Sequence, residues 1–471
     1  MLKLKRNTIN LLITFFLISL FSFFITFNKF YNISTNNNLI LIIPLFIILI
    51  SIVSYLILLF TIPLKIYGVK KFYLENHKLL LPIFALIALY VVNYFISPIE
   101  ITSNSTLLNF LFKNTNLSNF IFKNFTVIFL IIFILNIFLI NQLKFQEKEV
   151  FNILLKFSIF FLFLAILQNI LFYINKEIWV SNYISDANNC IYFQFLPFGI
   201  SGKRNYEIIP FIIGYALTLG LNKNKYLFLN SLFFIACYLT YSKNLWVTLI
   251  FLNIIGFFIF GKIFLIKRIF IKIFFLVITI YLLSFYLSAK DQCNPRIIDY
   301  TKIKIISLIN INNNEELNSI KKETILKLTP FQVYYGADNK ISDNEFIAKT
   351  DYLLDSTKPR MEIYKESLKK ISEKKLFGYG VNNYTLESNN SSNSESEFLK
   401  ILLDIGVVGM ILWLYFSIQL FKNCKSNWSF LILLSIMSLS LFNIYSWFLP
   451  IYFILTCVIF FEKNVRTKSI L

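Results

Sequence analysis

The stretch F-T-V-I-F-L-I-I-F-I-L-N-I-F-L-I, from Phe125 to Ile140, decides the class of fold. It contains no charged residue, and a helix needs about 20 mainly apolar residues to cross the hydrocarbon core of a bilayer. The stretch belongs to a run at about 120–141, and comparable runs recur at about 9–27, 39–62, 79–97, 151–175, 207–221, 226–241, 245–261, 268–288, 397–421, 428–442 and 446–461. The pattern predicts an all-α polytopic membrane protein of about 12 transmembrane helices.

Composition supports a membrane protein. Hydrophobic residues make up 57% of the 471-residue chain, against roughly 45 to 50% in soluble proteins. The formal charge of +20 is distributed between apolar runs rather than gathered on one soluble face, so it does not predict nucleic-acid binding. The basic start from Met1 to Arg6, followed by the first apolar run, is interpreted as an uncleaved first helix.

The distribution of basic residues predicts the orientation in the membrane. With the N-terminus inside, the would-be cytoplasmic segments hold 20 Lys and Arg residues, and the short segments on the other side hold seven. By the positive-inside rule both termini are cytoplasmic. The long polar stretch 289–396 then lies outside and separates an N-terminal bundle of about nine helices (1–288) from about three C-terminal helices (397–471).

The second half of this large loop contains a well-defined helical pattern. Residues 356–380 read S-T-K-P-R-M-E-I-Y-K-E-S-L-K-K-I-S-E-K-K-L-F-G-Y-G. Ser356 or Thr357 can cap the helix, and Gly378 and Gly380 stop it. We expect a short amphipathic helix whose apolar face rests on the membrane surface or on the bundle; that face is formed by Met361, Tyr364, Leu368 and Ile371.

Cysteine and histidine usage predicts no metal site and no cofactor. The five cysteines show no CxxC or Cys/His spacing, and His77 is the only histidine, so a zinc or haem site lacks its ligand set. Cys190 and Cys293 both fall in segments expected outside the cytoplasm. They either form a disulfide or are two unpaired, small hydrophobic residues.

Cations near the outer membrane edge are the first candidate site residues. Lys203, Arg204 and Lys243 break the positive-inside pattern, and Arg360 lies in the large loop. Together they predict a cationic cluster that binds a phosphate or pyrophosphate, for which the planar guanidinium of Arg204 is best suited. The alternative is that the individual lysines snorkel to the interface, as is expected of Lys156 and Lys400 near the ends of their spans.

Carboxylates at the end of the loop are the second candidate. Glu395 and Glu397 lie where the chain re-enters the membrane, and Asp404 follows about two helical turns later. A carboxylate at such an edge can take a proton from a sugar hydroxyl. The alternative is ordinary capping by Ser394 or Ser396 with acidic residues in the first turn, which we favour for Glu397 and leave open for Glu395.

The region from Arg360 to Met410 resembles the signature region of the O-antigen ligase and O-antigen polymerase superfamily. The helix that begins with Arg360 runs into L-F-G-Y-G-V-N-N-Y, and S-E-S-E-F-L-K-I-L-L-D-I-G-V-V-G-M follows. Thr240 to Trp246, T-Y-S-K-N-L-W, looks like the T-x-S-R element of the family, with Lys243 at the usual arginine. Gly202-Lys-Arg-Asn-Tyr206 resembles a further family stretch.

This resemblance implies a GT-C-like, metal-independent glycosyltransferase of the bacterial inner membrane, with a periplasmic large loop. Its donor would be an undecaprenyl-diphosphate-linked glycan, and its acceptor a second glycan or lipid A core. A chain-length regulator is a further candidate partner. Arg204, Lys243 and Lys203 would bind the pyrophosphate, with Arg360 and Glu395 as catalytic residues.

At one position the chain departs from the family pattern, and this difference favours one of two related activities. Ligases use a histidine at the loop exit, where this chain has Glu395-Ser-Glu-Phe-Leu399. The sequence therefore favours a polymerase, which joins oligosaccharide repeat units, over a ligase, which transfers the finished glycan to lipid A core. A polysaccharide flippase also has a dozen spans, but it has no need of a large external loop.

Overall fold

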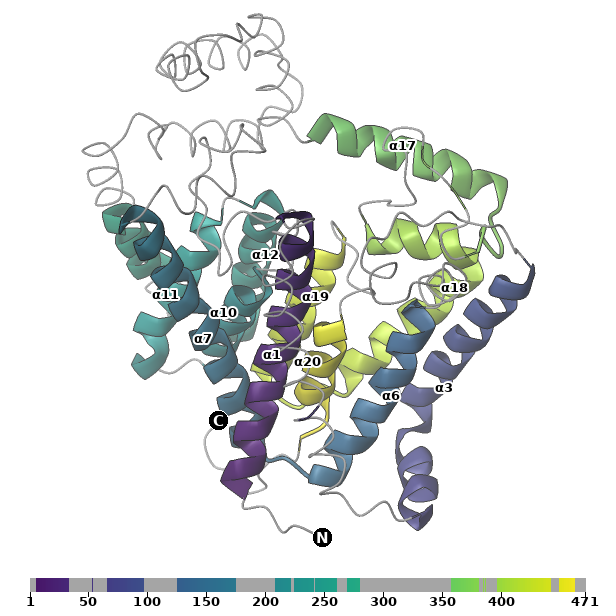
Figure 1. The fold of residues 1–471 in the computed structure, drawn as a ribbon, viewed down its shortest axis with the longest axis horizontal. Helices are drawn as coiled ribbons and strands as arrows, with labels where there is room; N and C mark the ends of the chain where they lie inside the picture. The colour runs from purple at the N-terminus through teal and green to yellow at the C-terminus, as the bar shows by residue number, and fades with distance from the viewer. Residues whose placement is uncertain are drawn as a thin grey trace, which may run out of the picture. The chain divides into compact units, whose positions relative to one another are not determined.

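The computed structural model describes residues 6–33, 53, 66–96, 125–174, 208–221, 224–240, 242–260, 269–279, 357–380, 384, 386, 396–441 and 449–461. Helices dominate this part of the chain, and it contains no β-strand. The all-α class predicted from the apolar runs is therefore confirmed for the described residues (Figure 1). The chain divides into two compact units, and each is described by itself.

The first unit comprises residues 1–161, 201–221 and 362–471. Its helices are α1 (Arg6–Ile33), α3 (Ile66–Ile96), α6 (Phe125–Leu143), the first part of α7 (Glu147–Ile174), α10 (Ile209–Leu221), most of α17 (Thr357–Glu373), α18 (Glu397–Lys422), α19 (Asn427–Ser440) and α20 (Leu449–Ile459). The helices of this unit pack in pairs that include α10 with α19, α18 with α3, α20 with α6, α3 with α6, and α1 with α20.

Close backbone approach and aromatic packing hold this unit together. Every residue of α10 from Ile209 to Gly220 is buried. A β-carbon on Gly220 would overlap the backbone of Trp428 on α19, so glycine is needed where the two helices meet. Elsewhere Phe133 of α6 packs on Tyr452 of α20, with ring centroids 5.5 Å apart.

The second unit comprises residues 162–200 and 222–361. Its described helices include α11 (Leu227–Leu239), α12 (Lys243–Phe260) and the stretch Ile269–Thr279. The rings of Tyr238 and Trp246 stack at 4.9 Å, and the Trp246 indole N–H donates to the Tyr238 carbonyl at 3.1 Å. This pair closes the tight connection between α11 and α12.

Within the described residues, four helical segments are long and apolar enough to cross a membrane: Phe72–Asn93, Thr126–Leu143, Glu147–Leu167 and Glu397–Lys422. Shorter apolar helices overlap the other predicted runs, apart from 39–62, which lies outside the described residues except for Val53. The helical character of the described runs is confirmed. The count of about 12 spans and the domain boundaries stay predictions.

The helix predicted in the large loop is α17, which starts where the caps predicted and ends at Glu373, five residues before Gly378. Its buried face differs from the predicted one. Met361 and Leu368 are 50% and 57% exposed, whereas Ile363 and Ser367 are buried. The predicted Tyr364 and Ile371 do pack on the bundle, against a cluster of Ile363, Tyr384, Leu386 and Leu403. Met361 and Leu368 do not pack on the described bundle, and their contact with the membrane surface stays a prediction.

Candidate functional site

The structure places two of the five predicted site residues on helices. Lys243 is the first residue of α12, and Arg360 lies in the first turn of α17. The structure describes the backbone of these two residues and not their side chains. Lys203, Arg204 and Glu395 lie outside the described residues. The convergence of the five residues on one site therefore stays a prediction.

The signature region that follows α17 forms an interlock with α18, made by residues 375–380 and 403–408. The N–H groups of Tyr379 and Gly380 donate to the carbonyls of Leu403 and Asp404, at 2.7 and 2.9 Å. In return, the N–H groups of Val407 and Val408 donate to the carbonyls of Lys375 and Leu376, at 2.9 and 3.3 Å. Two turns of chain separated in sequence thus exchange four backbone hydrogen bonds.

This exchange replaces two hydrogen bonds of the α18 helix. In an unbroken helix Val407 would donate to Leu403, and Val408 to Asp404, four residues earlier. α18 is broken at Gly406, whose φ of 66° and ψ of −164° are not helical. The interlock satisfies the backbone groups that the break leaves free, as it must where a chain crosses a membrane.

Glycines at two positions make the interlock sterically possible. Gly378 has a φ of 70°, and a β-carbon there would lie 2.6 Å from the Leu403 carbonyl oxygen. A β-carbon on Gly406 would overlap the carbonyl of Leu376. Positive φ and close backbone contact both require glycine at these two positions, so the spacing of the signature glycines has a structural cause.

The interlock is also attached to α3. The side-chain amide of Asn93, which is buried, donates to the carbonyl of Phe377 at 3.1 Å. Tyr379 donates its hydroxyl to the Glu373 carboxylate at 2.6 Å. Burial and this hydrogen bond raise the pKa of Tyr379 to about 12, so its hydroxyl remains a donor at physiological pH.

A buried ion pair lies in the first half of α18. The Lys400 amine is 3.2 and 3.1 Å from the two carboxylate oxygens of Asp404, and both residues are 1% exposed. The same amine lies 3.5 Å from the Tyr384 hydroxyl. The prediction that Lys400 snorkels to the interface is wrong, because Asp404 four residues later offers it an internal partner on the same helix face.

The start of α18 follows the predicted pattern in part. The helix begins at Glu397, with Ser396 as the N-cap residue, but the Ser396 side chain makes no capping hydrogen bond. Glu397 is buried, at 4% exposure. It is therefore placed among packed side chains rather than on a solvated first turn.

Sequence reasoning missed the partners in this region. The i, i+4 spacing of Lys400 and Asp404 indicates that the two side chains can form an ion pair. Asn93 and Tyr384 carried no such signal, because an asparagine near a span end and a tyrosine in an aromatic-rich chain are ordinary residues there. The region as a whole is a hydrogen-bonded junction between the residues after α17, α3 and α18, and it contains polar and charged groups within a membrane protein.

Comparison with known protein families gives a match. Residues 228–414 match the family model described as O-antigen ligase. This match supports the O-antigen ligase-related superfamily that the resemblance predicted. The match supports glycan transfer of the O-antigen ligase or polymerase type, with lipid-linked glycan substrates, by a bacterial membrane protein. No protein of curated function matches the chain.

Proposed function

We propose that the protein polymerises undecaprenyl-diphosphate-linked oligosaccharide repeat units in the bacterial inner membrane. The observation that carries this proposal is the extent of the O-antigen ligase domain, residues 228–414. That range includes Lys243, Arg360, the whole interlock and the loop exit at Glu395. Three of the five proposed site residues and the structural junction thus lie in the matched range, whereas Lys203 and Arg204 precede it.

The pyrophosphate of the donor is proposed to bind Lys203, Arg204 and Lys243, with Arg360 acting on the leaving group. Lys243 and Arg360 both lie in the first turn of a helix. Free backbone N–H groups and the helix dipole favour an anion at that end. A cationic side chain there adds to the same attraction, which supports a role in holding phosphate oxygens.

The reaction forms one glycosidic bond, breaks the bond between the donor glycan and the pyrophosphate, and transfers one proton. An acceptor hydroxyl oxygen attacks the anomeric carbon of the donor glycan, while the bond from that carbon to the pyrophosphate oxygen breaks. Undecaprenyl diphosphate leaves, and its developing negative charge is stabilised by the cations. Glu395 takes the proton of the acceptor hydroxyl as general base. No metal is required where fixed cations supply this stabilisation.

The interlock contributes by fixing the helix that carries Arg360. α17 begins with the turn of Arg360 and leads directly into the residues that hydrogen-bond to α18. Catalytic groups must be held within fractions of an ångström to be effective. We therefore assign the two glycines and Asn93 as positioning residues that do not touch the substrate.

A ligase that transfers the glycan to lipid A core is the alternative, and the description of the matching family model favours it. The glutamate at position 395 in place of a histidine favours the polymerase. Full-length protein in liposomes, given lipid-linked repeat units with or without lipid A core, separates the two. If the lipid-linked glycan is lengthened in liposomes that contain no lipid A core, the result supports the polymerase. Product that appears only on lipid A core would establish the ligase instead.

A further inference from the structure

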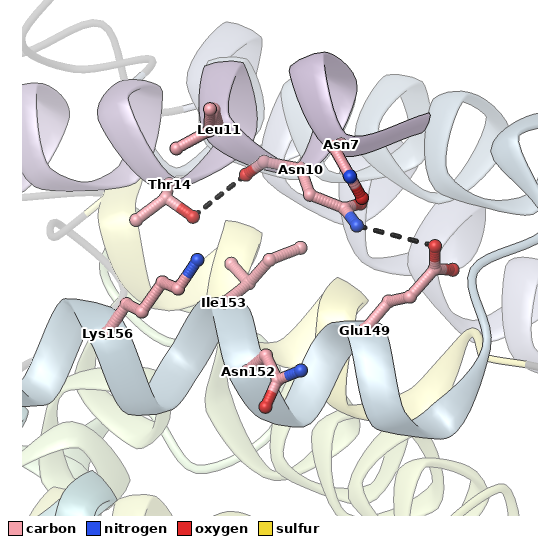
Figure 2. A pocket seen from close by; sticks show the side chains of 8 residues that line it. All are labelled: Asn7, Asn10, Leu11, Thr14, Glu149, Asn152, Ile153 and Lys156. Carbon is pink, nitrogen blue, oxygen red and sulfur yellow. Dashed lines mark hydrogen bonds between the residues drawn. The ribbon is translucent and has the colours of Figure 1, made fainter. Parts of the chain in front are cut away.

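A polar pocket lies between the first three turns of α1 and of α7, in a part of the chain that the O-antigen ligase domain does not include. Its volume is about 360 Å³, and its polar lining includes Asn7, Asn10, Glu149, Asn152 and Lys156. Figure 2 shows Asn10 of α1 facing Glu149 of α7, and Lys156 reaching from α7 toward α1. The proposed glycan chemistry gives this pocket no role.

The only carboxylate in the pocket lining is already neutralised. Arg6 donates from Nε and Nη2 to the two carboxylate oxygens of Glu149, at 2.7 and 2.6 Å. The amide of Asn10 donates to the same carboxylate at 3.3 Å. A bidentate pair of this kind is geometrically specific and holds both partners. Lys156 therefore gives the pocket a net positive charge.

Lys156 itself lies deep along its helix. It is about 14 Å along the axis from the start of α7, within the apolar segment Glu147–Leu167 that is long enough to span a membrane. Its side chain is exposed, and among the described residues no acceptor lies against its amine. A charged ammonium group at such a depth in a membrane costs free energy unless it reaches water or binds an anion.

The pocket continues into an exposed apolar surface on both helices. On α1, Leu11 and Phe15 are 50% and 58% exposed; on α7, Ile159 and Phe160 are each 40% exposed. These residues lie on the side of the pocket away from Arg6 and Glu149. Along both helices the polar and cationic groups therefore come first and the apolar groups follow. The head group and acyl chains of a lipid have the same order.

We propose that this pocket binds the head group of an anionic phospholipid of the phosphatidylglycerol kind. The lipid phosphate accepts from Lys156, and the glycerol hydroxyls bond to the exposed amides of Asn7 and Asn152. The acyl chains lie along Leu11, Phe15 and Phe160. A head group that ends in an ammonium fits less well, because Arg6 and Lys156 both lie at this site. Basic pockets between transmembrane helices bind anionic lipids in this manner.

The test measures thermal unfolding of the full-length protein in neutral detergent during titration with lipid. Phosphatidylglycerol raises the unfolding midpoint of the wild type, whereas phosphatidylcholine has a smaller effect. In Lys156→Gln the apparent affinity for phosphatidylglycerol falls at least about ten-fold, because one charge-assisted hydrogen bond is lost. Lys156→Arg retains most of it. Lys148→Gln, the same charge change on an exposed residue of α7 outside the pocket, leaves the affinity unchanged.

Three results would overturn this proposal. The first is a Lys156→Gln protein that responds to phosphatidylglycerol as the wild type does, which would mean that Lys156 simply snorkels. The second is an equal loss in Lys148→Gln, which would indicate general surface charge. The third is an equal stabilisation by inorganic phosphate at the same concentration, which would assign the pocket to free phosphate rather than to a lipid.

Discussion

Gly378 and Gly406 interlock reciprocally: a β-carbon on either one would collide with the backbone of the segment that carries the other. Gly378 faces Leu403 to Ile405, and Gly406 faces Leu376 and Phe377. Both glycines also have positive φ. The turn after α17 and the break in α18 are therefore one structural feature, and neither conformation is explained without the other.

Gly378→Ala and Gly406→Ala are expected to destabilise the protein by at least about 2 kcal/mol each, since both strain the backbone and separate the two segments. Thermal unfolding in detergent measures the effect. Gly409→Ala is the comparison variant, because Gly409 has no positive φ and the three atoms nearest to its β-carbon belong to the Ile405 side chain rather than to the backbone. A lower midpoint for Gly409→Ala than for the other two would contradict this explanation.

Removal of one partner of the buried ion pair is expected to cost more than removal of both. Lys400→Met leaves the Asp404 carboxylate buried without its cation, at a cost of about 3 to 5 kcal/mol. The double variant Lys400→Met with Asp404→Leu should recover most of that loss. Unfolding midpoints of the wild type, both single variants and the double variant form the cycle. Additive losses would show that the pair does not act as a unit.

Asn93→Ala should cost about 0.5 to 1.5 kcal/mol through the hydrogen bond that joins α3 to Phe377. Asn76→Ala on the same helix is the control, because the Asn76 amide bonds only to the Phe72 carbonyl one turn earlier. If Asn93 positions the interlock, its loss also lowers glycan transfer, and loss of Asn76 does not. Equal activity of the two variants would remove Asn93 from the positioning residues.

The sequence could predict features that depend on local pattern. The start of α17 follows from its cap pattern, and the apolar helices follow from hydropathy. The sequence could not predict which face of α17 is buried, because Tyr384, Leu386 and Leu403 reach it from other segments. Nor could it predict the break in α18, because glycine at position 406 is compatible with a straight apolar helix. Only the backbone exchange with residues 375–380 requires the break.

The same limit applies to the charged residues. Lys400 and Lys156 look alike in sequence, each a lysine within an apolar run. Lys400 has Asp404 one turn later and is buried, whereas Lys156 has no acidic residue at that spacing and is exposed beside a pocket. The partner, rather than the lysine itself, decides between a buried ion pair and an exposed cation.

The most direct test of the central claim is glycan transfer by the full-length protein in liposomes, with undecaprenyl-diphosphate-linked repeat units as donor and acceptor. Our account predicts that the wild type lengthens the lipid-linked glycan and that Arg360→Ala or Lys243→Ala lowers the rate by about 100-fold or more, as loss of transition-state charge stabilisation does. Lys365→Ala, an exposed cation on α17, should retain the activity. Chain lengths in Arg360→Ala and Lys243→Ala equal to those of the wild type would contradict the account.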